Sequence, residues 1–470
     1  MHMPSGQSDA PSAIAPAPLA PQDAPPIAPR QAARWFLLLA WTFGLVFALV
    51  TPPFQVPDEY DHFYRAYQVS EGHFTQTQVA DQIGGYLPRS LIDFQNRVSQ
   101  DIPHHPQIKQ NLHTLLSLRS LPLNVDDREF VLFPWYSPTN YLPQAAAIAI
   151  ARHLGAGPLT VTYAGRLGNL FVWSLLVYCA LRIIPLLDWT IFLLALMPMS
   201  LSLAASMSAD AMVNGICFLF IAVVLRFAVG DDRPIGPARF AALLFLIAAL
   251  ALAKTAYLPL ALLLLIIPPT KFGGLRRYLL ACGALATVAL LVSIAWTLYT
   301  YRDFVNPDSS PRDQAIFLLH HPFATAADYV GQLCSLSFLS SIIGKLGWYD
   351  TRLSRPLVAL YLLVLIWTTR IGGWPLVRLN HRQKWIIAAS AVCIWLAVFT
   401  LVDLAFTRVG NTGVTSLQGR YMIPLTPLVF LLLYPAPALR HRERGPLIAA
   451  FSACFCLYVV GVLVWRFYAV

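Results

Sequence analysis

The residues best suited to chemistry stand together in the run Pro52-Pro53-Phe54-Gln55-Val56-Pro57-Asp58-Glu59-Tyr60-Asp61-His62, which directly follows the apolar run 34–50. Ionisable side chains at the end of a membrane helix are costly unless they act on something, so these residues are candidate functional groups. The alternative interpretation is that this run is the start of an ordinary solvated loop. The prolines argue against it, because they hold the ionisable residues at a fixed height above the bilayer, which such a loop does not need. A carboxylate placed here could take a proton from a hydroxyl nucleophile.

Cationic and amide side chains stand at the ends of later apolar runs, and the cations suit a phosphate ligand. Arg offers a phosphate or diphosphate ester a planar, bidentate fork. The paired acids Asp58 and Glu59 could instead help to hold a divalent metal such as Mg²⁺ or Mn²⁺. For each residue alone the alternative is snorkelling or helix capping, and for the set it is salt bridging that only holds helices together. The residues concerned are Arg166, Asn169, Asp210, Asn214, Lys254, Asp403, Gln418, Arg420 and Tyr421.

The composition indicates which elements position these groups. The chain has 470 residues, of which 57% are hydrophobic and 12% charged, with a mean hydropathy of +0.59. A soluble protein carries about twice that charged fraction, so we expect a polytopic membrane protein in contact with a lipid bilayer. In a membrane protein the net charge of +10 is explained by topology, because Lys and Arg accumulate in the cytoplasmic loops. No basic run interleaved with aromatic residues suggests a nucleic-acid partner, and the seven cysteines form neither a disulfide framework nor a zinc pattern.

Apolar runs of membrane-spanning length predict an all-α protein with about 11 transmembrane helices, within a range of about 10–13. We interpret the shorter run 141–154 as a helix lying on the membrane surface. The Ala- and Pro-rich segment 1–33 is expected to be a disordered cytoplasmic tail, and 34–470 a single membrane domain. The predicted spans are 34–50, 161–182, 189–206, 210–229, 239–254, 257–269, 278–299, 355–371, 385–404, 421–437 and 446–466.

Charge asymmetry orients these spans. With a cytoplasmic N-terminus, most Lys and Arg residues fall in short cytoplasmic loops, as the positive-inside rule requires. The long loops 51–160 and 300–354 then lie outside and form a cap of surface helices. In this topology the acids at 58–59, His62 and the polar residues named above, from Arg166 to Tyr421, gather at one external, polar cavity.

Several of these motifs, in sequence order, resemble a bacterial membrane protein family catalogued as domain of unknown function 2142. The run 52–67 resembles its opening signature, although Tyr60 stands where a smaller residue or proline is expected. Three later segments of the chain resemble further blocks of that family. They are Ser-Ala-Asp-Ala at 208–211, Gly-Trp-Tyr-Asp-Thr at 347–351 and Gln-Gly-Arg-Tyr-Met-Ile-Pro at 418–424. The family is grouped with GT-C type integral membrane glycosyltransferases, which have a large first periplasmic loop carrying jaw helices and use polyprenyl-phosphate-linked or polyprenyl-diphosphate-linked sugars.

The resemblance implies a role for each matching residue. Asp58 would be the catalytic base, with Glu59 as its alternative or as a metal ligand. Arg420 would bind the donor phosphate, with Lys254 and Arg166 as weaker candidates. The expected reaction transfers a sugar to a cell-envelope glycan or lipid acceptor at the periplasmic face of the bacterial inner membrane.

Aromatic residues of the external loops could stack on sugar rings or line the bilayer surface as a belt. They are Trp135, Tyr136, Tyr141 and Trp348. Two other functions remain open. A polysaccharide polymerase or ligase of another fold would place its essential acid or base in 300–354. A non-enzymatic transporter or flippase of lipid-linked sugars would spread polar groups through the depth of the bilayer.

Overall fold

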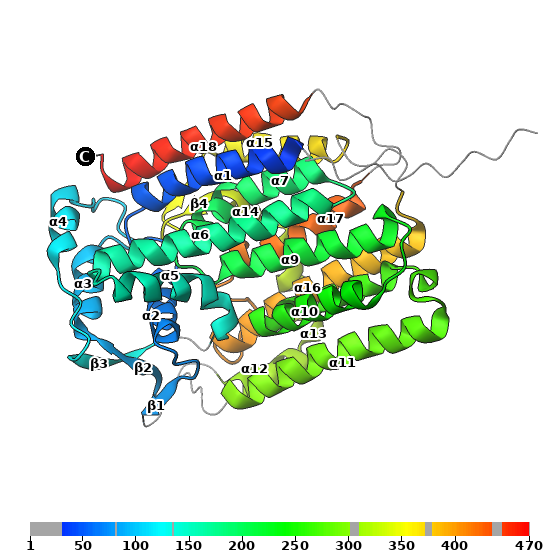
Figure 1. Cartoon of the computed structure of the whole chain (residues 1–470), viewed down its shortest axis with the longest axis horizontal. Coiled ribbons are helices and arrows are strands. Elements are labelled where there is room, and N and C mark those ends of the chain that lie inside the picture. The colour runs from blue at the N-terminus through cyan, green and yellow to red at the C-terminus, as the bar shows by residue number, and fades with distance from the viewer. Residues whose placement is uncertain are drawn as a thin grey trace, which may run out of the picture.

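The computed structural model describes residues 31–79, 82–133, 136–300, 310–371, 378–434 and 444–469. Within these residues, six helices are long and apolar enough to cross a membrane, and they lie side by side in one bundle (Figure 1). The pair α13 (Pro322–Leu333) and α14 (Leu336–Gly344), bent by 51°, would make a seventh. The six are α1 (Gln31–Val50), α6 (Pro158–Ile183), α9 (Asp210–Leu225, continued by the π-turn Arg226–Gly230), α11 (Leu275–Thr300), α16 (His381–Phe406) and α18 (Gly445–Phe467).

The remaining five predicted runs also contain helix, but in shorter pieces. In the runs 189–206, 257–269 and 421–437 proline is a local reason, because it removes a backbone donor and disrupts the α-helical hydrogen-bond ladder. Pro198 separates two helices of the run 189–206, and Pro259 lies inside a 3₁₀ segment. These pieces are α7 (Asp188–Leu196), α8 (Pro198–Ala204), α10 (Pro237–Ala253), η4 (Thr255–Ile266), α15 (Arg355–Thr368), η6 (Gly419–Leu425) and α17 (Thr426–Leu432).

The first long loop forms a compact cap at one end of the bundle (Figure 1). Its helix α5 corresponds to the predicted helix 141–154, and it packs against α2 and α6. Aromatic side chains such as Phe54, Phe63 and Phe94 form a separate buried core there. The cap elements are α2 (Glu59–Ser70), β1 (Thr77–Val79), β2 (Gln82–Pro88), α3 (Arg89–Ser99), α4 (Leu112–Ser117), η1 (Leu118–Ser120), β3 (Arg128–Leu132), η2 (Pro138–Tyr141) and α5 (Leu142–His153).

The cap adds a few short strands to a chain that is mainly helical, as expected of an all-α membrane protein. Strands β1, β2 and β3 form an antiparallel sheet in that order, with Gly84 opposite Leu132. A second antiparallel pair, β4 (Lys345–Leu346) and β5 (Thr351–Arg352), flanks the turn that carries Trp348. These strands are short, and the chain is otherwise mainly helical.

The second long loop is also more than a set of surface helices. It contains α12 (Pro311–His320) and then the bent pair α13–α14, which passes the length and hydropathy test for a membrane span. α14 packs against α8 and η6. This loop therefore reaches the elements that carry the candidate site.

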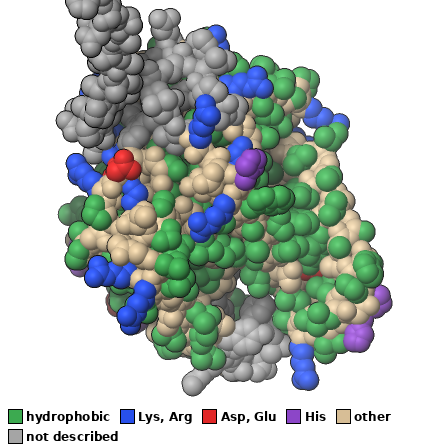
Figure 2. Space-filling view, turned by 90° about the vertical axis from the view of Figure 1, so that its right-hand side faces the viewer, with side chains coloured by type: hydrophobic (Ala, Val, Ile, Leu, Met, Phe, Trp, Pro, Cys, Tyr) green, Lys and Arg blue, Asp and Glu red, His purple; other side chains and the backbone are tan. Residues whose placement is uncertain are grey.

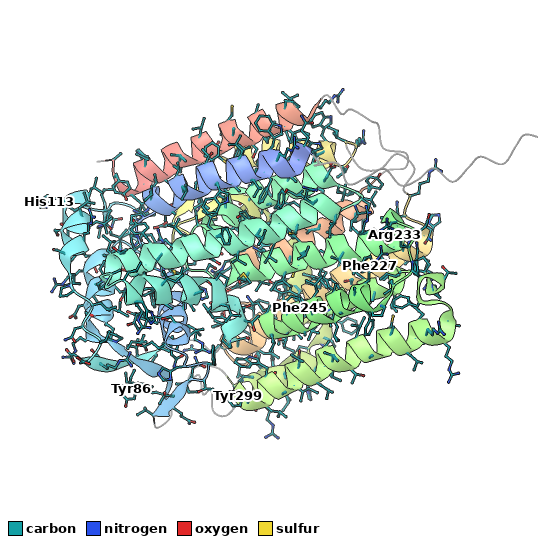
Figure 3. The ribbon with its side chains drawn as sticks, viewed as in Figure 1. Tyr86, His113, Phe227, Arg233, Phe245 and Tyr299 are labelled. Atoms are coloured by element: carbon teal, nitrogen blue, oxygen red, sulfur yellow. The ribbon has the colours of Figure 1, made fainter. Side chains whose placement is uncertain are left out.

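The bundle is organised around a central helix with lipid-exposed helices outside. In the most apolar stretch of α9, 83% of the residues are buried inside the protein, whereas in that of α11 only 17% are. Figure 3 shows α11 at the edge of the bundle, with Tyr299 at its end toward the cap and Arg233 at the opposite end of the molecule. The exposed leucines of α11 are typical of a surface that faces lipid tails.

The end opposite the cap is basic. Figure 2 looks onto this end and shows Lys and Arg side chains scattered over it, with few Asp or Glu. The first helix also begins earlier than predicted, since Gln31 to Ala33 belong to α1 and both alanines are buried. Alanine is a strong helix former, which explains the longer helix. The rest of the predicted tail, 1–30, lies outside the described residues.

Candidate functional site

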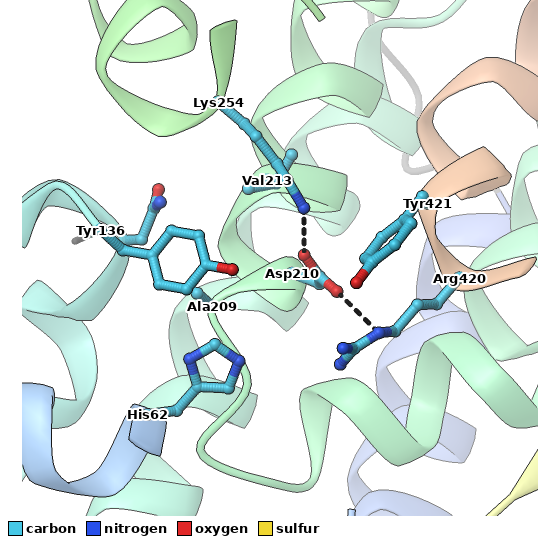
Figure 4. A pocket seen from close by; sticks show the side chains of 9 residues that line it. His62, Tyr136, Ala209, Asp210, Val213, Lys254, Arg420 and Tyr421 are labelled. Carbon is cyan, nitrogen blue, oxygen red and sulfur yellow. Dashed lines mark hydrogen bonds and ion pairs between the residues drawn. The ribbon is translucent and has the colours of Figure 1, made fainter. Parts of the chain in front are cut away.

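A small cavity lies where the cap meets the bundle, with room for about one water molecule. Five segments that are far apart in the sequence converge on it (Figure 4). α2 and the η2 region contribute from the cap, while the starts of α9, η4 and η6 contribute from the bundle. The lining residues are His62, Tyr136, Asn140, Ala209, Asp210, Val213, Lys254, Arg420 and Tyr421.

Two cations face one carboxylate in this cavity. Lys254 Nζ lies 3.3 Å from Asp210 Oδ1, and Arg420 Nε lies 3.5 Å from Asp210 Oδ2. The Tyr421 ring is shared by both cations, at 4.4 Å from Lys254 Nζ and 5.2 Å from the Arg420 guanidinium carbon. Arg420 and Asp210 are both buried. Charges held this far from bulk solvent interact strongly, so the cavity is suited to an anionic ligand.

Asp58 joins the same charge network from the cap side. Its carboxylate forms an ion pair with Arg420 Nη2, and Arg420 Nη1 donates to the Pro57 carbonyl at 3.2 Å. The Asp58 side chain is 38% exposed, whereas that of Arg420 is 2% exposed. Asp58 therefore lies between solvent and the buried guanidinium.

The backbone of Asp58 is also unusual. It precedes α2 in the left-handed region, at φ 61° and ψ 16°, and its side chain makes no capping hydrogen bond. An aspartate at this position normally adopts an extended backbone and accepts from the first turn of the helix. A non-glycine residue in the left-handed region is mildly strained, and such residues cluster at functional sites.

His62 contributes a neutral polar group to the cavity. Burial lowers the pKa of its imidazole to about 4, which outweighs the opposing effect of the Asp58 charge. Its Nδ1 and the Tyr141 hydroxyl are 2.8 Å apart. At neutral pH the positive charge of the cavity lining therefore comes from Lys254 and Arg420.

Asn140 lines the cavity and was not identified from the sequence. Its Nδ2 donates to the Ala253 carbonyl at 2.7 Å, which links η2 of the cap to the end of α10. Its Oδ1 is buried and makes no hydrogen bond within the described part of the chain. A buried amide oxygen without a partner is an available acceptor for a ligand hydroxyl. Only its position in Ser-Pro-Thr-Asn-Tyr-Leu-Pro, beside Tyr141, could have suggested it.

Glu59 and Arg166 do not belong to this cavity, which corrects two sequence-based assignments. They form an ion pair that is 0% exposed on both sides, with Arg166 Nη2 at 2.7 Å and Nε at 2.8 Å from the carboxylate. Glu59 also accepts from the backbone N–H groups of Phe54 and Met207, and Arg166 donates to the carbonyls of Ala48, Thr51 and Pro52. Because every polar atom of the pair is engaged, it ties the end of α1 to α2, α6 and the start of α9. We therefore assign it a structural role instead of base, metal or phosphate chemistry.

Four further predicted residues also lie outside the lining. One of them, Asp403 of α16, accepts from Gln314 Nε2 at 3.1 Å and from the Tyr329 hydroxyl at 2.9 Å. Asn169 Nδ2 donates to the carbonyls of Ser206 and Ser208, so it holds the junction of α8 and α9. Asn214 is buried one turn beyond Asp210, and Gln418 directly precedes η6. Asn214 Nδ2 and Gln418 Oε1 make no hydrogen bond among the residues that the structure describes.

The described residues do not fit the divalent metal that was left open as an alternative role for Asp58 and Glu59. No group of three or more His, Cys, Asp and Glu side chains that could hold an ion occurs among them. The two acids proposed as ligands are committed to different arginines, Asp58 to Arg420 and Glu59 to Arg166. The positive charge of a neighbouring guanidinium also repels a metal cation and so disfavours its binding.

Asp61 belongs to the acidic run that the sequence singled out, but the sequence indicated no role of its own for this residue. It follows Asp58 by three residues in α2 and is partly buried, yet it forms no hydrogen bond or ion pair with any described residue. Burial, followed by the charge of Asp58, raises its pKa to about 7. Its place in the acidic run and its i, i+3 spacing from Asp58 were the signals visible in the sequence.

The predicted aromatic residues have separate positions. Tyr136 lines the cavity, and Tyr141 is the partner of His62. Trp348 stacks on Tyr60, with ring centroids 5.7 Å apart, and donates from Nε1 to the Phe54 carbonyl at 2.9 Å. Trp135 lies outside the described residues.

Comparison with known proteins gives one match. The model of a family described as predicted membrane protein (DUF2142) matches residues 41–429. No curated protein matches the chain, and no solved structure does. The match spans every residue of the cavity lining.

Proposed function

The chain therefore belongs to this family of predicted membrane proteins, and from that premise we propose that it is an integral membrane glycosyltransferase of the GT-C type. Its donor is a sugar linked to polyprenyl phosphate, and its acceptor is a cell-envelope glycan or lipid. The observation that carries the proposal is the meeting of Arg420 and Lys254 with acidic residues in one cavity below the cap.

The chemistry of the cavity supports transfer from a phosphate donor. Cleavage of a sugar–phosphate bond leaves negative charge on the phosphate, and preorganised cations lower the barrier by stabilising it. Arg420 can bind two phosphate oxygens at once, and Lys254 adds a second charge. A carboxylate of the 58–61 segment accepts the proton of the attacking hydroxyl.

The location of the cavity supports a lipid-linked donor. It lies at the cap end of the bundle, where helices α1, η4 and η6 end or begin, so a ligand there sits at headgroup depth. The opposite end is basic (Figure 2). We assign that end to the cytoplasm by the positive-inside rule, which places the N-terminus inside and the cap in the periplasm of a bacterial inner membrane. In this topology the eleven apolar runs cross the membrane, some as broken helices.

The test is turnover by the purified full chain in lipid nanodiscs. Candidate polyprenyl-phosphate sugars are supplied, and release of polyprenyl phosphate is measured. Arg420→Ala is expected to reduce kcat by about 10²–10³-fold, as removal of one preorganised donor does elsewhere. Arg420→Lys, which keeps the charge and loses the fork, is expected to be intermediate.

The matched control is Arg89→Ala, which removes an exposed arginine of the cap. It is expected to leave turnover unchanged. Wild-type turnover that does not depend on Arg420, or no turnover with any polyprenyl-linked donor, would contradict the proposal.

A further inference from the structure

The two carboxylates at 58 and 61 are in opposite situations. Asp58 is bound to Arg420, whereas Asp61, one turn along the same helix, has no partner among the described residues. We propose that Asp61 is the base that deprotonates the acceptor, and that Asp58 occupies the phosphate position on Arg420 until the donor displaces it. This inference rests on the proposed glycosyltransferase function and reassigns the base from Asp58 to Asp61.

Asp58 has the properties of a displaceable occupant. Its carboxylate offers Arg420 the same planar pair of oxygens that a phosphate offers. Its side chain is the exposed member of the pair, so an incoming ligand meets it before the buried guanidinium. Asp210 on the far side is buried and also contacts Lys254, so it would stay in place.

Asp58 also has an alternative place to go. The first turn of α2 receives no side-chain cap in this structure, and Asp58 is held in a left-handed backbone. Once released from Arg420, its carboxylate can accept from the free N–H groups of that turn, as aspartates commonly do. Displacement therefore exchanges an ion pair for helix capping instead of leaving a bare charge.

Asp61 has the properties of a base that is ready to act. A partly buried carboxylate without a hydrogen-bond donor is uncommon, because burial without a partner costs free energy. Among the described residues, the titratable groups that interact with its charge are Asp58, which directly precedes α2, Tyr60 and Tyr64 of α2, and Tyr141 of η2. None of these is a cation, so no salt bridge with a described residue occupies its lone pairs. Its pKa of about 7 suits proton transfer at neutral pH.

The proposed step balances as follows. The acceptor hydroxyl gives its proton to the Asp61 carboxylate while its oxygen forms a bond to the anomeric carbon of the donor sugar. The bond between that carbon and the phosphate oxygen breaks, and the electron pair leaves with the polyprenyl phosphate on Arg420 and Lys254. The proton then passes from Asp61, which is partly exposed, to solvent.

The experiment separates binding from turnover in the full chain in nanodiscs. Binding of a fluorescent polyprenyl phosphate reports the Arg420 site, and release of lipid phosphate from the sugar donor reports turnover. Asp58→Asn is expected to bind the probe about tenfold more tightly, because a neutral amide competes poorly for the guanidinium. Asp61→Asn is expected to bind as the wild type and to lose about 10²–10⁴-fold in kcat, with partial recovery in Asp61→Glu.

Asp93→Asn, at an exposed carboxylate of α3, is the control for both measurements and is expected to change neither. Asp58→Asn that loses turnover with no gain in binding would overturn the inference and restore Asp58 as the base. Unchanged turnover in Asp61→Asn would also overturn it. If the wild-type protein binds the probe but cleaves no donor, the proposed function fails, and tighter binding by Asp58→Asn still supports the displacement.

Discussion

Glu59→Gln gives the sharpest test of the division between structural and functional acids. The wild-type carboxylate accepts four hydrogen bonds, two from Arg166 and one each from the backbone N–H groups of Phe54 and Met207. A glutamine offers only one acceptor oxygen. Its amide N–H groups would point toward N–H donors, with which they cannot form hydrogen bonds. The variant therefore leaves Arg166 as a buried charge without its counter-ion.

The expected loss of stability is about 3–5 kcal/mol, the usual cost of breaking one side of a buried ion pair. Both side chains are 0% exposed, so solvent cannot replace the lost contacts. Glu129→Gln makes the same chemical change in the cap, but its ion pair with Arg89 is about half exposed on both sides. That control is expected to cost less than about 1 kcal/mol.

Thermal unfolding of the purified protein, followed by tryptophan fluorescence, measures both variants against the wild type. Glu59→Gln should unfold at a clearly lower temperature, while Glu129→Gln should not. If Glu59→Gln unfolds like the wild type and yet loses turnover, the structural assignment is wrong and Glu59 takes part in the chemistry.

Two further variants test the unpaired acid and the cap sheet. Because the folded-state pKa of Asp61 is raised to about 7, its ionisation opposes folding, so its destabilising effect grows from about pH 4 and is complete above pH 7. Asp61→Asn is therefore expected to stabilise the protein by about 2 kcal/mol at pH 8, a figure discounted for the partial exposure of the side chain. At pH 4 it is expected to have no effect. Equal stabilisation at pH 4 and pH 8 would refute this. Gly84→Ala would place a Cβ 1.8 Å from the Val131 carbonyl oxygen, so it should separate β2 from β3 and speed proteolysis of the cap. Gly331→Ala, where a Cβ meets nothing within 4 Å, should resist proteolysis like the wild type.

The apolar runs could be recognised from the sequence because hydrophobicity and length are local properties. Each run contains helix in the structure, and prolines such as Pro198 and Pro259 mark some of the places where a long helix is replaced by shorter pieces. The small cap sheet was missed because β1 and β3 are short, and β2 contains two adjacent glycines. The pairing of β2 with β3 joins residues 40 to 48 positions apart, which no local pattern shows.

The candidate site was predictable as a set but not in its roles. Asp58, His62, Asp210, Lys254, Arg420 and Tyr421 do meet, as their positions at one end of the predicted spans implied. Glu59 and Arg166 were grouped with them for the same reason, yet they pair with each other away from the cavity. Position along the membrane normal is encoded locally, whereas the direction of a side chain around its helix depends on what packs there.

The sequence by itself determined that this is a membrane protein, where its apolar segments run, and that acids follow the first of them. The tertiary structure decided which acid serves which purpose. Asp58, Glu59 and Asp61 are close neighbours, but their partners, Arg420 for the first and Arg166 for the second, come from distant helices, and the third has none among the described residues. The physical reason is that a carboxylate's chemistry depends on its burial and on the charges beside it, and both arise only when the chain has folded.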